Sequence, residues 1–256
     1  MDIHQIRNAT VLITYGGKRF LIDPYLAEKD AYPGFPGTVN SHLRNPRLEL
    51  KTPMDTILDV DAVIVTHLHA DHWDEAAVKL VPKDMKVFVQ DYSDAEVLKA
   101  QGFKDVNLLS FETKVGDVTL TRTRGQHGSD AAYVMAGELL GSVCGVVFRA
   151  EGEKTLYLAG DTVWNDYVKA NLDAHTPEVI VVPAGDAQVP GLGSIIMNTD
   201  DVKGLYEAAP KARIVTNHHD TVNHCVLSRD ELREFLRENG MKDRVLVPED
   251  GEVLTF

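Results

Sequence analysis

The chain is poor in cysteine, with only Cys144 and Cys225 among its 256 residues. Two cysteines are too few for the disulfide framework that holds together many small secreted proteins. They are also too few for a zinc site built from thiolates. A metal centre in this chain would therefore have to use nitrogen and oxygen ligands.

Positive charge is scarce as well. The chain has 26 Lys and Arg residues against 39 Asp and Glu residues, which gives a formal net charge of −13, and its basic residues do not gather in a run. A surface this acidic repels polyphosphate, so we expect no nucleic-acid partner. A small-molecule substrate is the expected partner.

Long apolar runs and an export signal are both absent. No stretch approaches the roughly 20 apolar residues that a membrane-spanning helix needs, so we expect no membrane association. Residues 1–4 lack the basic segment and apolar core of a signal peptide, and we expect a cytoplasmic protein. Because the sequence shows neither a repeat nor a linker, we expect a single domain over residues 1–256.

What the chain does contain is a dense group of histidines after an apolar run. Residues 61–65 read as a buried strand, and His67, His69, Asp71 and His72 follow it. Alternate residues of an extended segment point the same way, so the first three share a direction while His72 aims elsewhere. This geometry suits two adjacent metal ions, the first held by His67 and His69 and the second by Asp71 and His72. The alternative is a polar loop with unrelated histidines, but four ligand-type residues in this order favour a metal site.

Two further strand ends carry residues that could bind a metal. His127 lies between glycines after a predicted strand at 118–124, and this position by itself favours a turn histidine over a metal ligand. Asp161 follows the predicted strand 154–159 and a glycine. It could be a metal ligand or the N-cap of a helix that begins near Trp164.

Three histidines follow the last predicted core strand, residues 212–216. The strand direction favours His218 as a ligand, because His219 should point the other way. His224 lies further along the loop. It could bind the substrate or donate a proton to the leaving group, or it could be a packed histidine without a catalytic role.

The sequence leaves open the roles of several loop residues. Asp23 follows the predicted strand 18–22 and could either cap the turn at Pro24 or face the site. Residues 25–54 are irregular and contain several prolines and glycines, which is typical of a lid over a site or of a subunit contact, so a homo-oligomer stays open. Substrate specificity is expected to reside in the loops around Tyr32, Asp186 and Gly191. His42 and Arg44 could contact a substrate anion or be ordinary solvated residues.

Hydrophobic periodicity and turn residues place the remaining elements. Helices are predicted at 74–80, 94–101, 200–209 and 228–239. Strands are predicted at 9–15, 18–22, 61–65, 86–90, 105–110, 118–124, 145–150, 154–159, 178–183, 212–216 and 245–247.

The His-x-His-x-Asp-His pattern at 67–72, together with Gly160–Thr162, resembles the signature of the metallo-β-lactamase superfamily. Ile22–Pro24, Asn223–Cys225 and an extended segment at Ile6–Thr10 bring the chain closest to the ascorbate-6-phosphate lactonase-like branch. The resemblance implies an α+β fold, a four-layer αββα sandwich with the site along one edge.

The resemblance also implies a ligand set and two divalent metal ions per chain. Zinc is the default metal, with manganese and iron open. The first site would contain His67, His69 and His127, the second would contain Asp71, His72 and His218, and Asp161 would bridge the two.

Such a centre implies a metal-dependent hydrolase. Two ions lower the pKa of a shared water, Asp71 relays a proton while it stays a ligand, and His224 acts on the leaving group. A small ester or lactone is the expected substrate. The alternatives are a phosphodiesterase that acts on a small nucleotide and a metal-binding protein without catalytic turnover.

Overall fold

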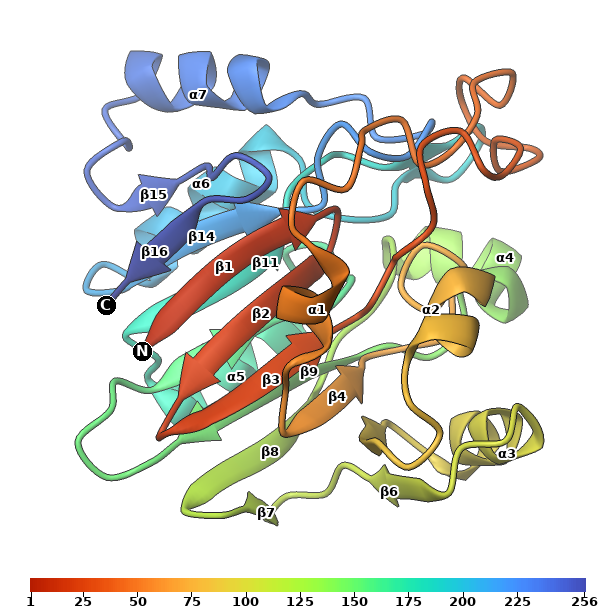
Figure 1. Cartoon of the computed structure of the whole chain (residues 1–256). Coiled ribbons are helices and arrows are strands. Elements are labelled where there is room, and N and C mark those ends of the chain that lie inside the picture. Colours follow the sequence, from red (N-terminus) through yellow and green to blue (C-terminus); the bar gives the residue numbers. More distant parts are fainter.

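The computed structural model describes residues 1–256 and contains two seven-stranded mixed sheets that pack face to face (Figure 1). An apolar cluster of 21 buried residues lies between the sheets and includes Ile13, Phe20, Phe148 and Val181. Burial of this surface is the main contribution to the stability of the sandwich.

The first sheet begins with antiparallel strands and ends with parallel ones. Its strands β2 (Thr10–Tyr15) and β3 (Lys18–Ile22) form the predicted hairpin, in which Gly16 and Gly17 both adopt a positive φ. The strand order is β16 (Val253–Thr255), β1 (Asp2–Arg7), β2 (Thr10–Tyr15), β3 (Lys18–Ile22), β4 (Ala62–Val65), β5 (Lys86–Val89) and β6 (Asp105–Leu108).

The second sheet repeats this arrangement, since its earlier strands pair antiparallel and its later strands pair parallel. The strand order is β15 (Val245–Leu246), β14 (Arg213–Asn217), β11 (Val179–Pro183), β10 (Leu156–Leu158), β9 (Cys144–Arg149), β8 (Val118–Arg124) and β7 (Thr113–Val115). A separate small hairpin consists of β12 (Gln188–Val189) and β13 (Gly193–Ser194).

Helices cover the outer face of each sheet, and two further apolar clusters lie beneath them. The first sheet is covered by α1 (Met54–Leu58), α2 (Glu75–Leu80) and α3 (Tyr92–Ala100), and the second by α5 (Asp166–His175), α6 (Thr199–Ala208) and α7 (Arg229–Glu238). The order helices, sheet, sheet, helices confirms the predicted α+β sandwich. None of these helices is both long enough and apolar enough to cross a membrane.

Strand β4 shows why the apolar run at residues 61–65 predicted a buried strand. Ala62 and Ile64 face the other sheet, whereas Val63 and Val65 pack in the cluster under the helices. All four side chains have no exposed surface. A strand that is buried on both faces appears in the sequence as a continuous apolar run.

The structure differs from the sequence-based prediction at the N-terminus and around residue 135. Residues 6–10 are not one extended segment, because the chain turns at Asn8 (φ 54°) between β1 and β2. Helix α4 (Asp130–Leu140) was not predicted, since its apolar residues lie on exposed and buried faces alike and give no amphipathic pattern. Strand β16 was missed as well.

The edge of the sandwich that carries the carboxyl ends of β3, β4, β10, β11 and β14 positions the site. Parallel strands end at the same edge of a sheet, so the loops that follow them meet there. This edge lies near α2 and α4 (Figure 1). It receives each of the histidine- and aspartate-bearing segments identified in the sequence.

Candidate metal centre

The seven residues predicted as ligands come from four separate loops and lie together. Their potential ligand atoms form overlapping groups in which all atoms are within 4.8 Å of one another. All except His69 are buried. They are His67, His69, Asp71 and His72 after β4, His127 after β8, Asp161 after β10 and His218 after β14.

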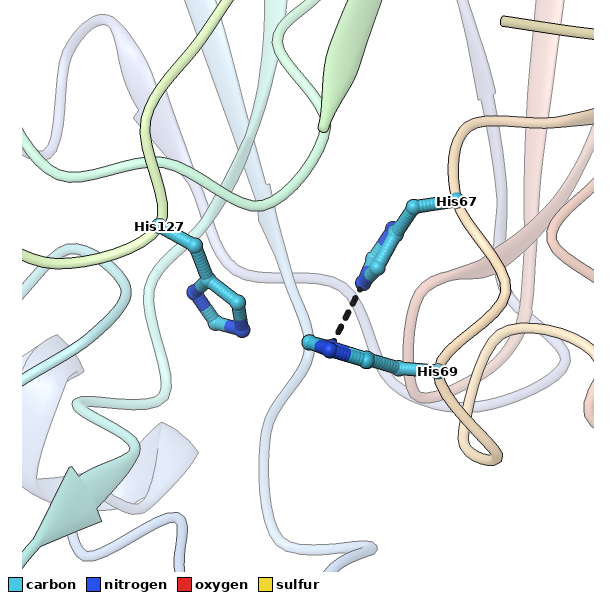
Figure 2. A group of neighbouring side chains, drawn as sticks. All are labelled: His67, His69 and His127. Atoms are coloured by element: carbon cyan, nitrogen blue, oxygen red, sulfur yellow. Dashed lines mark hydrogen bonds between the residues drawn. The ribbon is translucent and has the colours of Figure 1, made fainter. Parts of the chain in front are cut away.

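The first group consists of His67, His69 and His127 (Figure 2). His67 Nε2 lies 3.0 Å from His69 Nδ1. His127 reaches the same space from the opposite side, and its Nε2 atom lies 3.7 Å from Asp161 Oδ2. The group therefore offers three imidazoles and no carboxylate of its own.

The second group consists of Asp71, His72 and His218. His218 Nε2 lies 3.2 Å from Asp71 Oδ2 and 3.2 Å from His72 Nε2. This group mixes one carboxylate with two imidazoles, and all three residues are buried.

Asp161 lies between the two groups. Its Oδ2 atom is 3.2 Å from His72 Nε2 in the second group and 4.0 Å from His67 Nε2 in the first. Its other oxygen, Oδ1, is buried and has no hydrogen-bond partner in the protein. The alternative role as a helix N-cap does not apply, because Asn165 caps α5.

Each of the five imidazoles has an outer nitrogen, which faces away from the centre, and an inner nitrogen, which faces it. The outer nitrogen forms a hydrogen bond that fixes the ring. His67 donates to Thr66 Oγ1 (3.1 Å), His69 to Leu139 O (3.2 Å), His72 to Asp23 Oδ2 (2.9 Å), His127 to Ile195 O (2.6 Å) and His218 to Cys225 Sγ (3.4 Å). A neutral ring that donates through one nitrogen presents a lone pair on the other. When all five rings are neutral, their inner nitrogens present lone pairs to the same space, which is how the outer partners of metal-binding histidines orient them.

These inward lone pairs need a positive charge between them. His67 Nε2 and His69 Nδ1 are 3.0 Å apart, and the Nε2 atoms of His72 and His218 are 3.2 Å apart. Two lone pairs at this distance repel unless a proton or a cation lies between them. Divalent ions fit this donor set of imidazoles and carboxylates.

The pKa values point to the same need for a cation. Burial acts to lower the pKa of His72, but the carboxylates of Asp161 and Asp23 outweigh it and raise the pKa to about 10. Burial acts to raise the pKa of Asp71, but the neighbouring rings of His218 and His72 outweigh it and hold the pKa well below its usual range. For His127, burial dominates and lowers the pKa to about 4. The carboxylates thus stay ionised and attract whatever positive charge is present.

Asp23 faces the centre. Its carboxylate accepts hydrogen bonds from the Thr66 N–H (2.7 Å), the Thr66 hydroxyl (2.7 Å) and His72 Nδ1 (2.9 Å). The Thr66 hydroxyl is in turn the acceptor for His67. Asp23 therefore orients one histidine directly and a second through Thr66.

The two adjacent histidines after β14 separate as the strand direction predicted. His218 has a left-handed backbone (φ 61°), which turns its ring into the second group. His219 points away, with Nε2 3.1 Å from Thr216 Oγ1 and Nδ1 3.4 Å from Leu227 O. Burial lowers the pKa of His219 to about 3.

His224 lies beside the centre with only 7% of its surface exposed. Its ring packs edge-on against Phe35 at 5.2 Å, and its Nδ1 atom has no protein partner. Burial lowers its pKa to about 4, so the ring is neutral near pH 7. The next side chain back, Asn223, accepts from Phe35 N and donates to Val39 O, which ties the irregular segment to this loop.

Two of the other loop residues, Arg44 and Asp186, have structural partners. Arg44 donates to Asp30 O and Ala31 O and so stabilises its own loop, while His42 is exposed. Asp186 accepts from Gln188 and Ser194, which braces the β12–β13 hairpin.

The sequence reasoning missed Tyr25. Its side chain is 1% exposed, and its hydroxyl is a buried group without a protein partner. Burial raises its pKa, and the carboxylate of Asp71 raises it further. The only signal in the sequence was its position directly after Asp23 and Pro24.

Comparisons with known proteins agree with this geometry. A family model described as the β-lactamase superfamily domain matches residues 18–219, which include all seven candidate ligands. The chain is 49% identical over 257 residues to the UPF0173 protein YddR of Bacillus subtilis (strain 168), and 31% identical over 263 residues to a UPF0173 metal-dependent hydrolase of Bacillus cereus (strain Q1). Both matches cover 100% of both chains.

A solved structure is similar over the whole length. The isothiocyanate hydrolase from Delia radicum gut bacteria superposes with a TM-score of 0.97 at 47% sequence identity. The match covers 100% of this chain and 99% of that one. The strand-end loops that form the centre therefore lie within a fold shared over the entire chain.

Proposed function

Because the chain belongs to the metallo-β-lactamase superfamily, and within it to the UPF0173 metal-dependent hydrolases, we propose that it hydrolyses a small uncharged electrophile, with isothiocyanates as the substrate class. The observation that supports hydrolysis is the set of potential metal ligands that face one another. Five imidazoles held by outer hydrogen bonds and two ionised carboxylates surround one space.

The two groups would each hold a divalent ion. The first group supplies three neutral nitrogens, the second supplies two nitrogens and Asp71, and Asp161 reaches both. Zinc is the expected metal because it prefers imidazole and carboxylate ligands in this number, and manganese and iron accept the same ligands. When bound, such ions lower the pKa of a coordinated water towards neutrality and polarise the substrate.

The protein's own residues supply the proton handling and the shape of the site. Asp71 is ionised and buried, so it can orient the attacking water and relay its proton towards the product. His224 presents a free nitrogen beside Asp71 and can hydrogen-bond the substrate. Asp161 places a carboxylate oxygen between the two groups and near a histidine of each.

The substrate class rests on the similarity to isothiocyanate hydrolase. In an isothiocyanate, R–N=C=S, the central carbon is electrophilic. Water oxygen bonds to that carbon, the nitrogen takes up a proton, and the resulting thiocarbamic acid splits into an amine and carbonyl sulfide. One water is consumed, and no oxidant or reductant is needed. An apolar cluster that includes Ile195, Leu140 and Cys225 adjoins the centre and suits an uncharged substrate.

Esters and lactones, which the sequence favoured, present a carbonyl carbon to the same nucleophile and belong in the same assay. Phosphodiesters fit less well. None of the side chains within hydrogen-bond or ion-pair distance of the seven candidate ligands is Lys or Arg. The chain as a whole carries a net charge of −13.

A substrate panel on zinc-loaded protein tests the proposal. We expect turnover of allyl and phenethyl isothiocyanate, followed by amine release, at rates well above those for a γ-lactone, p-nitrophenyl acetate or bis-p-nitrophenyl phosphate. His67→Ala should lower metal content and rate together, whereas His42→Ala, a change of an exposed histidine, should alter neither. Faster turnover of the lactone or the phosphodiester would contradict isothiocyanates as the substrate class and favour the faster compound's class instead. Metal binding without turnover of any compound would contradict an enzymatic role.

A further inference from the structure

Tyr25 differs from the other fully buried tyrosines in having a hydroxyl without a protein partner. The Tyr15 hydroxyl donates to Phe148 O (3.0 Å) or Lys154 O (2.8 Å), and the Tyr157 hydroxyl accepts from Asn171 Nδ2 (3.0 Å). An unpaired buried hydroxyl destabilises the folded state, so a native protein that keeps one usually uses it.

The Tyr25 ring is held rigidly, so the free hydroxyl is not the result of a loose side chain. The guanidinium of Arg7 lies 5.3 Å from the ring centroid, and the ring of Tyr32 stacks on it at 6.4 Å and 21°. The Tyr25 backbone is bonded on both sides, with its N–H donating to Thr10 Oγ1 (2.9 Å) and its carbonyl accepting from Arg7 (2.7 Å).

Tyr25 lies close to the metal centre. Tyr25 follows Asp23, which binds His72, and its side chain packs in one apolar cluster with Cys225, the partner of His218. After burial, the carboxylate of Asp71 contributes most to the raised pKa of the Tyr25 hydroxyl. His224, another side chain near Asp71 with an unpaired buried polar atom, comes from the same loop as Cys225.

We propose that Tyr25 is a catalytic residue whose hydroxyl donates a hydrogen bond to the substrate atom that becomes negatively charged as water adds to the electrophilic carbon. In an isothiocyanate this atom is the nitrogen or the sulfur, which takes the electron pair of the broken C=N or C=S π bond. The phenolic O–H bond stays intact. The donor is fixed and shielded from water before the reaction, which is the condition under which such a hydrogen bond stabilises a transition state most. This inference rests on the proposed hydrolysis.

The variant Tyr25→Phe removes only the hydroxyl and keeps the stacking. We expect kcat for isothiocyanate hydrolysis to fall by about 10- to 100-fold, with KM nearly unchanged, because the interaction forms chiefly in the transition state. Metal content should be the same as in the wild type. The melting temperature should be unchanged or higher, since a buried unpaired group is removed.

Tyr157→Phe is the matched control, because that buried tyrosine loses a hydroxyl that has a partner. It should lower the melting temperature and leave kcat and KM as they are. If Tyr25→Phe behaves in this way instead, its hydroxyl is structural and the inference is overturned.

A binding measurement separates Tyr25 from the identity of the substrate. Thiocyanate is a linear anion with the same N, C and S atoms, and it can be titrated calorimetrically into zinc-loaded protein. Tyr25→Phe should weaken its binding several-fold, whereas Tyr157→Phe should not. Inactivity of the wild type on every isothiocyanate would overturn the proposed substrate, yet the thiocyanate titration would still decide the role of Tyr25, and equal affinity of wild type and Tyr25→Phe would overturn it.

Discussion

The group of His67, His69 and His127 holds no carboxylate, and one of its members, His69, is partly exposed. The group of Asp71, His72 and His218 contains a carboxylate and is buried throughout. Their outer partners differ as well. The first group hydrogen-bonds mainly to backbone carbonyls, of Leu139 and Ile195, whereas the second relies on the side chains of Asp23 and Cys225.

This difference has a direct electrostatic meaning. A carboxylate in a buried site attracts a cation strongly because little water screens it. The second group should therefore bind its ion more tightly, and the first group should exchange its ion more readily with solvent. Asp161 lends negative charge to both groups and limits how far they can act independently.

Complete removal of metal should have the largest effect. A chelator in excess should lower the hydrolysis rate by about 1,000-fold or more, because no group other than the metal can activate water to this extent here. Under limiting chelator, we expect two ions to leave in two steps, and His69→Ala to abolish only the faster one. Release should accelerate as the pH falls, since imidazoles must lose their proton to bind metal. A chelated protein that keeps its full rate would contradict the metal mechanism, and a single release step would remove the distinction between the groups.

Asp161→Asn should have the next largest effect. The substitution removes the negative charge between the two groups but nearly preserves the side-chain shape, so the fold should persist. We expect loss of one ion, chiefly from the first group, which has no carboxylate of its own, and a fall in kcat of about 100-fold. Metal analysis and circular dichroism of the same sample test this result. Two ions in the variant would show that Asp161 is not shared between the groups.

Cys225→Ala should have the smallest effect and acts only on the second group. It removes the acceptor for His218 Nδ1, and loss of such an outer partner typically weakens metal affinity by about 10-fold. Cobalt-substituted protein should show a changed visible spectrum for one of its two ions. Cys144→Ala provides the control, because that buried thiol contacts the Thr66 carbonyl and no histidine ring. Equal spectra for Cys225→Ala and the wild type would mean that His218 needs no partner to hold its orientation.

Separation along the sequence explains which parts of the site were predictable. His67, His69, Asp71 and His72 are close in sequence, so backbone geometry alone fixes their relative directions. The choice between His218 and His219 depended in a similar way on the direction of a single strand, and His218 is the one that lies in the second group. In each case, the local chain already contained the information.

The alternatives that the sequence left open depended on distant segments. Asp23 orients His72 across 49 positions, and Asn165 rather than Asp161 caps α5. Tyr25 was overlooked because its surroundings, including Cys225 in the loop after β14, are far away in the sequence. Helix α4 was missed because its apolar residues follow no single face.

The sequence by itself determined the buried strands, the capping box of α7 at Ser228 and Glu231, and the histidine motif after β4. Each of these depends on spacing over a few residues, which the backbone converts directly into geometry. Only the tertiary structure decided that Asp161 lies between two groups and that the Tyr25 hydroxyl has no partner. Those facts depend on how two sheets pair and pack, because strand register, and not sequence proximity, sets which loop ends meet at the edge of the sandwich.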